Sequence, residues 1–297
     1  MRTYLDCYPC FLRQALSAAR QVGADDAQQH EIMDQTLALL QRLPLGASPP
    51  EIAYGVHRIV REHMGHSDPY RNLKAHSTRA ALALYPRLKG LVAESVDPLE
   101  TAVRLSIAGN IIDFALSDEL ADLWAAVERV LAAPFAVDDL AALRTALDAA
   151  DCVLYLADNA GETVFDRVLI ETLEVPVTYV VKGGPTLNDA TRENALAAGL
   201  ETGAPLIDNG SDAPGTILSL CSEDFRQVYA AAPLVIAKGQ ANYETLSEAG
   251  PRVFCLLQVK CPVIGRDLGA PVGSVIVRQS HNGLVKNLFS DMLLNCF

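Results

Sequence analysis

Residues 151–173 read DCVLYLADNAGETVFDRVLIETL, and their pattern indicates the class of fold. Asp151–Ala157 is an almost continuous apolar run, which is typical of a strand buried on both faces of a sheet. A polar turn follows, and Glu162–Leu173 then repeats apolar residues at helical spacing. The stretch therefore predicts a buried strand, a tight polar turn and a helix.

The alternation of strand and helix continues to the end of the chain. Further apolar runs rich in Val, Ile, Leu and Tyr predict strands at Val175–Lys182, Pro205–Asp208, Pro233–Lys238, Arg252–Lys260 and Gly273–Val277. The helix-like stretches between most of them are Asp189–Ala198, Gly215–Leu220 and Asn242–Ala249. This alternation predicts an α/β fold, a mostly parallel sheet with helices on both faces. The last two runs lie close together, so we expect one antiparallel edge.

The first half of the chain has a different texture, with helical apolar spacing separated by Pro and Gly. The predicted helices are Cys10–Ala19, Glu31–Leu43, Ile52–Met64, Ala75–Leu88, Pro98–Leu116 and Leu120–Leu131. We therefore predict a helical subdomain over residues 1–148 and an α/β core over residues 149–297.

Composition argues against several classes of partner. The 297 residues include 24 basic and 36 acidic side chains, a net charge of −12, and no basic run. Nucleic-acid binding draws on clustered Lys and Arg, so we do not expect that partner. No apolar stretch approaches the roughly 20 residues of a membrane helix. The N-terminus does not resemble a signal peptide, so we expect a cytoplasmic protein with no membrane partner.

Polar residues and glycines gather directly after the predicted strands, where α/β sheets bind ligands. The candidates at this rim are Asp158, Asn159, Gly161, Glu162, Asp189, Lys238 and Asn242. Asp and Asn oxygens without nearby His or Cys suit Mg²⁺ or Mn²⁺ better than zinc. Glycines let backbone N–H groups approach an anion, and Lys238 would place a positive charge on phosphate oxygens.

Each of these residues, taken singly, also has a structural alternative. Asp158 fits a turn or a helix cap. Thr186 and Asp189 match a capping box that needs no metal. Their joint placement after successive strands favours a functional site.

Asn110 and Asp113 stand three residues apart in an apolar helical stretch and share one helix face. Helix capping or an inter-helix contact is the structural alternative, because buried polar groups need partners. We favour a role in closing the site from the helical half, with Asn110 as a substrate-binding candidate.

The remaining reactive side chains carry weaker signals. Cys7 and Cys10, with Cys261, fit either structural packing or a metal tether, and we place no catalysis there. Three histidines between residues 57 and 66 lack the His-Glu-x-x-His order of zinc proteases, so we predict surface positions for them.

Seven short motifs follow one another across nearly the whole chain: Cys7–Cys10, Asp68–Tyr70, Gly109–Asp113, Asp158–Glu162, Asn188–Ala190, Lys238–Glu244 and Lys260–Cys261. Together they resemble the metal-dependent damage-control phosphatases, a family also named after a proposed acidic-residue methyltransferase. The resemblance is to its prokaryotic subgroup with an N-terminal Cys-x-x-Cys.

The resemblance implies a helical N-terminal part packed on a three-layer α/β/α core. It implies Asp158, Asn159 and Asp189 as ligands of Mn²⁺, Mg²⁺, Co²⁺ or Ni²⁺, and Lys238 as a phosphate contact. It also implies hydrolysis of sugar phosphates and other small, often damaged, phosphorylated metabolites.

The mechanism that we hypothesise is attack by a metal-oriented water on a phosphate monoester. Asp113 and Glu162 are the catalytic candidates that would position or deprotonate the water, and both stay open. One rival is a carboxylate methyltransferase, although Gly161 alone stands where a cofactor turn needs several glycines. The other rival is a metal-dependent binding protein without turnover. The sequence leaves the oligomeric state open.

Overall fold

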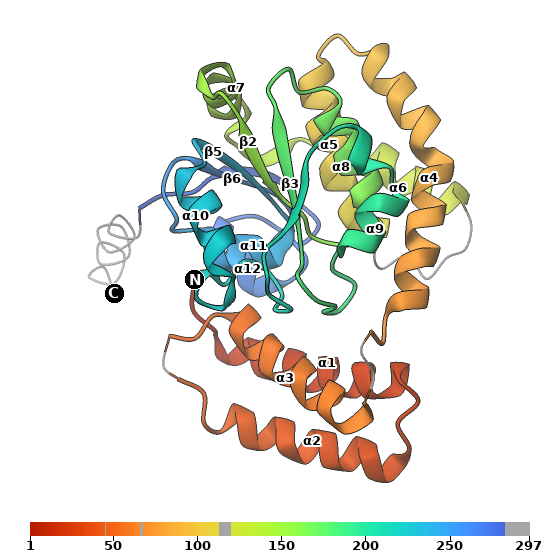
Figure 1. The fold of residues 1–297 in the computed structure, drawn as a ribbon, viewed down its shortest axis with the longest axis vertical. Helices are drawn as coiled ribbons and strands as arrows, with labels where there is room; N and C mark the ends of the chain where they lie inside the picture. Colours follow the sequence, from red (N-terminus) through yellow and green to blue (C-terminus); the bar gives the residue numbers. More distant parts are fainter. Residues whose placement is uncertain (45, 66–67, 113–119, 283–297) are drawn as a thin grey trace.

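The computed structural model describes residues 1–44, 46–65, 68–112 and 120–282. In these ranges one seven-stranded sheet forms the centre of the molecule (Figure 1). Its strands are β1 (Phe135–Asp138), β2 (Val153–Leu156), β3 (Val177–Val181), β4 (Leu206–Asp208), β5 (Leu234–Lys238), β6 (Val253–Gln258) and β7 (Val275–Gln279). The helices are α1 (Tyr8–Gln21), α2 (Asp26–Leu40), α3 (Pro49–Met64), α4 (Arg71–Ala93), α5 (Pro98–Ile112), α6 (Leu120–Ala132), α7 (Leu140–Ala149), α8 (Thr163–Ile170), α9 (Arg192–Ala197), α10 (Glu223–Ala231), α11 (Gly239–Leu246) and α12 (Pro262–Leu268).

The strand order β1-β7-β6-β5-β2-β3-β4 puts β2 where the direction of winding reverses. From β2 the chain builds β3 and β4 on one side, and it then returns to build β5 and β6 on the other. Neighbouring strands are parallel except β6 and β7, which pair antiparallel. The predicted, mostly parallel sheet with one antiparallel pair is confirmed. A crevice is expected between the carboxyl ends of β2 and β5, at this switch in strand order.

Helices cover both faces of the sheet. On one face α4, α5, α6 and α8 pack around Tyr155 and Phe165. On the other face α10, α11 and α12 pack around Leu154 and Phe225. Leu154 and Tyr155 are consecutive in β2 and enter opposite layers because strand side chains alternate. Burial of each large apolar side chain contributes about 1.5–3 kcal/mol, so both layers hold the central strand in place.

The first three helices form a separate bundle, seen below the sheet in Figure 1. Phe11, Ile32 and Val56 are central to its buried cluster, which Val263 of α12 joins. Capping boxes start α2 and α3, with Ser48 as the N-cap of α3. The predicted helical region thus divides in two, because α4–α6 form a layer on the sheet instead of joining this bundle.

The six predicted N-terminal helices are present, but four elements were not predicted: β1, α7, α10 and α12. Three of the predicted helices differ from the structure: α9 begins at Arg192, α11 begins at Gly239, and residues 218–220 form only a 3-10 turn. β1 is four residues long and half-buried, so its pattern is weak. β1 precedes residue 149, where we predicted the boundary between the helical subdomain and the α/β core, yet it joins the sheet. The position of that domain boundary stays a prediction. None of the described helices combines the length and apolar character needed to cross a bilayer.

Candidate functional site

The loops that follow β2 and β3 are joined at the carboxyl end of the sheet. Ala190 N donates a hydrogen bond to Asp158 O at 2.8 Å. Asn159 and Asp189 form an isolated antiparallel bridge between the same two loops. The structure therefore brings Asp158, Asn159 and Asp189 together at the carboxyl ends of β2 and β3.

Asp189 does not cap a helix. α9 begins at Arg192, with Thr191 as the N-cap residue and Asn194 closing the capping box. Asp189 N instead donates to Thr186 O at 3.0 Å within a turn. The predicted helix start at Asp189 and the capping alternative for Thr186 and Asp189 are therefore wrong, and the Asp189 carboxylate is left for another role.

Two side-chain amides link two carboxylates at the centre of the site. Asn110 Nδ2 donates to Asp158 Oδ2 at 3.2 Å and to Glu162 Oε1 at 2.5 Å. Asn159 Nδ2 donates to the same two oxygens at 2.9 Å and 2.5 Å. Because both amide nitrogens face the carboxylates, the two carbonyl oxygens are directed elsewhere. Asn110 belongs to α5, so the helical half contributes to the site.

Two buried oxygens here accept no hydrogen bond within the described residues: Asn110 Oδ1, and Asp189 Oδ2, which has the Lys182 ammonium 3.4 Å away. A buried polar atom without a partner costs about 1–3 kcal/mol, which a bound cation would offset. Asp and Asn oxygens fit a hard divalent cation such as Mg²⁺ or Mn²⁺. In the described ranges no three Asp, Glu, His or Cys side chains are placed to hold a metal. An amide oxygen would therefore have to complete a metal site here.

Burial and mutual repulsion favour protonated carboxyl groups at this site. Burial raises the pKa of Asp158 to about 8, and the carboxylates of Glu162 and Asp189 add to the effect. Burial also raises the pKa of Asp189, while Lys182 and Lys74 oppose that rise. A divalent cation would relieve the repulsion and favour the ionised forms.

Lys238 ends β5 with a fully buried ammonium group. Its Nζ donates to Ser106 O at 2.8 Å, to Glu162 Oε2 at 3.0 Å and to Asp166 Oδ1 at 2.8 Å. Burial acts to lower the pKa of Lys238, but Asp166 and Glu162 outweigh it and raise the pKa above its ordinary value. A lysine ammonium has three hydrogens, so none is left here for the predicted phosphate contact.

Glu162, like Lys238, is buried and occupied by hydrogen bonds. Its side chain is buried, and its oxygens accept hydrogens from Lys238, Asn110 and Asn159. These contacts suit an orienting role better than proton transfer to water. Asp113, the other catalytic candidate, lies outside the described residues.

Asn242 and Gly161 lie beside these groups. Asn242 Nδ2 donates to Ala157 O at 3.1 Å and to Lys238 O at 2.8 Å, and its Oδ1 accepts from Thr216. Asn242 thus ties the end of β2 to the start of α11. Gly161 is buried in the turn before α8. For both residues the substrate contact stays a prediction.

The structure adds basic and acidic residues that sequence reasoning did not single out. Lys182 follows β3, and its Nζ lies 3.4 Å from Asp189 Oδ2. Lys74 of α4 is buried and pairs with Asp68 at 3.1 Å. The sequence held a signal for only one of these lysines: Lys182 stands at a strand end, as Lys238 does, whereas Lys74 has no such signal. Asp166 could have been found as a charge inside an apolar helix pattern.

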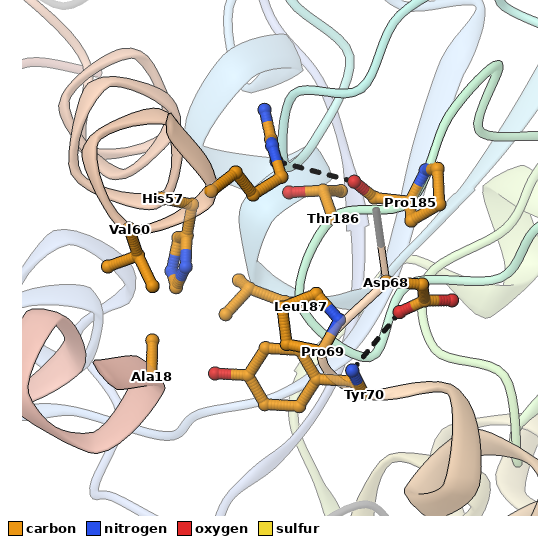
Figure 2. A pocket seen from close by; sticks show the side chains of 10 residues that line it. Ala18, His57, Val60, Asp68, Pro69, Tyr70, Pro185, Thr186 and Leu187 are labelled. Carbon is orange, nitrogen blue, oxygen red and sulfur yellow. Dashed lines mark hydrogen bonds between the residues drawn. The ribbon is translucent and has the colours of Figure 1, made fainter. Parts of the chain in front are cut away.

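A small cavity lies between α3 and the loop after β3, and Figure 2 shows His57, Tyr70, Thr186 and Leu187 around it. His57 is 4% exposed, so its predicted surface position is wrong. Burial, with a contribution from Arg61, lowers the pKa of His57 to about 4 and keeps the ring neutral. Its place on the apolar side of α3, beside Val56 and Val60 in helical spacing, was the missed signal.

The three cysteines of interest are free thiols. Cys7 immediately precedes α1 and Cys261 immediately precedes α12. Burial raises the pKa of Cys7, against an opposing backbone hydrogen bond, and the nearby Cys261 and Cys10 contribute to the rise. In the described residues the three thiols are not placed as a group to hold a metal ion, so the structure supports packing for them.

Comparison with known proteins identifies relatives over almost the whole length. A family model described as the damage-control phosphatase ARMT1-like domain matches residues 3–276. A damage-control phosphatase of Pyrococcus horikoshii is 32% identical over 282 residues, covering 93% of this chain and 97% of the relative. One from Archaeoglobus fulgidus is 32% identical over 287 residues, covering 92% and 97%. The crystal structure of a DUF89 family protein from Pyrococcus horikoshii aligns with a TM-score of 0.87 at 31% identity, covering 94% of this chain and 99% of that one.

Proposed function

The chain belongs to the damage-control phosphatase ARMT1-like family, and from that premise we propose that its phosphatase activity depends on a divalent metal ion. The substrates would be phosphate monoesters of small metabolites such as sugar phosphates, including damaged ones. Asp158, Asn159 and Asp189 would hold the cation, which would be Mn²⁺, Mg²⁺, Co²⁺ or Ni²⁺. We expect the protein to act in the cytoplasm.

One observation carries the metal proposal. Asn110 Oδ1 is buried and accepts no hydrogen bond within the described residues, next to the crowded carboxylates of Asp158 and Glu162. A cation at this place would give Asn110 Oδ1 a partner and would balance the negative charge. The place is also the switch in strand order, where α/β sheets bind ligands.

The chain would contribute rigid placement to the reaction. When bound, a divalent cation supplies charge that polarises a phosphoryl group and lowers the pKa of a water. Asp158 and Asp189 come from two loops that a backbone hydrogen bond holds together, so their carboxylates are fixed relative to each other. Preorganised groups of this kind cost no reorganisation during the reaction.

Positive charge for the phosphate oxygens would come from Lys182 more than from Lys238. The ammonium of Lys238 is taken up by three acceptors, whereas Lys182 lies 3.4 Å from Asp189 Oδ2 and donates to Gly215 O. A lysine acts on phosphate as a point charge, so it needs proximity more than fixed geometry. The attacking water must also lose a proton, and Asp113 remains our candidate acceptor.

Release of inorganic phosphate from a panel of phosphomonoesters tests the proposal. The wild type is assayed with Mn²⁺ and with EDTA, beside Asp158→Asn and the control Asp151→Asn, an exposed residue just before β2. We expect kcat/KM to fall at least about 100-fold in Asp158→Asn and not in the control, since even outer changes at metal sites cost 10- to 100-fold. Full activity in EDTA would reject the metal dependence. Undiminished turnover in Asp158→Asn would reject this site.

The methyltransferase alternative has its own measurement. Calorimetry with S-adenosylmethionine should give no heat of binding, because the turn after β2 has one glycine where such cofactors usually need more.

A further inference from the structure

A continuous chain of charged groups runs under the site. Asp166 Oδ1 accepts from Lys238 Nζ at 2.8 Å, and the same ammonium donates to Glu162 Oε2 at 3.0 Å. All three side chains are 0% exposed. They come from the end of β5 and from two sites four residues apart at the start of α8, so only the folded protein brings them together.

The inner end of this chain is fully hydrogen-bonded. Asp166 Oδ1 also accepts from Tyr155 OH at 2.8 Å and from Ser106 Oγ at 3.1 Å, and its Oδ2 accepts from Tyr179 OH at 2.7 Å. Asp166 thus has four donors, and its orientation is set from several directions.

Stability alone does not account for these charges. Removing an ion from water costs several kcal/mol even in real proteins, and apolar groups of similar volume often give equal or greater stability. Burial raises the pKa of Asp166, and the charge of Lys238 opposes that rise. Because burying these charges costs free energy, we look for a functional role at the outer end of the network, at Glu162.

The outer end of the chain is Glu162 Oε1, where both amide nitrogens of the site meet. Asn110 and Asn159 each place Nδ2 2.5 Å from this oxygen. If either amide turned over, its carbonyl oxygen would face a carboxylate and repulsion would replace a hydrogen bond. A negative charge on Glu162 therefore selects one amide orientation at both residues.

We propose that Asp166, Lys238 and Glu162 form a buried positioning relay that holds the carbonyl oxygens of Asn110 and Asn159 toward the cation. In this arrangement Asn110 Oδ1 becomes a fourth protein oxygen for the metal. Asp166 is a positioning residue that acts on the ligands through Lys238 and Glu162. The inference rests on the proposed metal site and deepens it.

If the relay positions the ligands, the charge of Asp166 should affect the affinity for the metal although Asp166 is not a ligand. Calorimetric titration with Mn²⁺ compares the wild type with Asp166→Asn, which keeps the size of the side chain and removes its charge. We expect about 10- to 100-fold weaker Mn²⁺ binding, the usual effect of losing an outer partner of a metal ligand. Glu162→Gln should weaken binding similarly and serves as the second variant should Asp166→Asn fold poorly.

A matched control separates positioning from general loss of stability. Leu143→Ala removes a buried side chain from α7, which packs near the opposite edge of the sheet, and lowers the melting temperature without touching the site. Its Mn²⁺ affinity should equal that of the wild type. Equal loss of affinity in Leu143→Ala and Asp166→Asn would overturn the relay.

The double variant Asp166→Asn/Glu162→Gln provides the sharpest outcome. In a relay the two losses are not additive, so the double variant should bind Mn²⁺ about as weakly as Glu162→Gln alone. Additive losses, or Mn²⁺ binding within about twofold of the wild type in both single variants, would contradict the inference. If the wild type binds Mn²⁺ but hydrolyses no phosphomonoester, the proposed function fails while the relay is still decided by the affinities.

Discussion

The main chain of Gly239 lies directly against the carboxylate of Asp158: a Cβ atom at position 239 would lie 1.8 Å from Asp158 Oδ2. Gly239 also has φ +80°, which side chains rarely adopt. It begins α11 immediately after Lys238. The end of β5 can therefore approach the residues after β2 only because position 239 has no side chain.

Gly239→Ala should displace the Asp158 carboxylate and lower Mn²⁺ affinity and phosphatase activity by at least about 10-fold, as ligand-orienting changes do. Gly269→Ala is the control, since Gly269 has φ +66° and no atom within 4 Å of a built Cβ. Both variants carry backbone strain of about 1–2 kcal/mol, measurable by urea unfolding. Only Gly239→Ala should lose metal binding, and equal losses would contradict the steric explanation.

Metal affinity should rise with pH. Since the pKa of Asp158 is about 8 without metal, its carboxyl group must release a proton when Mn²⁺ binds near pH 7. We expect affinity to increase by up to about tenfold per pH unit below pH 8 and then to level off. Calorimetry between pH 6 and 9, in buffers of different ionisation enthalpy, measures both quantities. An affinity independent of pH, with no proton release, would argue against Asp158 as a ligand.

The metal-free protein should become less stable as pH rises. The folded Asp158 binds its proton more tightly than the unfolded residue, whose pKa is near 3.8, so unfolding releases a proton between about pH 4 and pH 8. Glu244, whose pKa burial raises to about 7, acts in the same direction. In EDTA the free energy of unfolding should fall across this range, and Asp158→Asn should flatten the fall. A rise in stability over these pH values would show that the carboxyl is not buried as described.

Lys182→Met should weaken phosphate binding more than it affects metal binding. A charge-assisted contact contributes about 1.5–3 kcal/mol, so KM and the inhibition constant of inorganic phosphate should rise about 10-fold or more. Mn²⁺ should bind no more weakly, because the substitution removes a positive charge near Asp189. Lys89→Met, at a half-exposed lysine paired with Glu171, is the control. Unchanged phosphate inhibition would remove Lys182 from the substrate site.

The fold class and the rim of the site were predictable for one physical reason. A strand buried on both faces leaves a continuous apolar run, and a helix on a sheet leaves an apolar stripe, so the order of strands and helices after residue 150 could be read locally. Parallel strands share a carboxyl edge, so the residues after β2 and β3 were expected to lie together, and the loops that carry Asp158, Asn159 and Asp189 are joined. Short or half-exposed elements such as β1 lacked this signal.

The partners of the site residues were not predictable in the same way. Lys238 was expected to contact phosphate. Because β5 lies beside β2 in the sheet, the Lys238 ammonium instead contacts Glu162 and Asp166 near the start of α8. His57 carries the same side chain whether α3 faces solvent or another part of the protein, and only tertiary packing, which includes the loop after β3, buries it.

The amino-acid sequence alone predicted that this protein has an α/β sheet with oxygen-rich loops at one edge, because hydrophobic periodicity and turn residues are properties of short stretches of the chain. Only the tertiary structure brings β5 beside β2 across the intervening β3 and β4, and with it the pairing of Lys238 with Asp166. The physical reason is that buried charges must find partners wherever packing places them, and packing depends on contacts between residues more than 70 positions apart, such as Glu162 and Lys238.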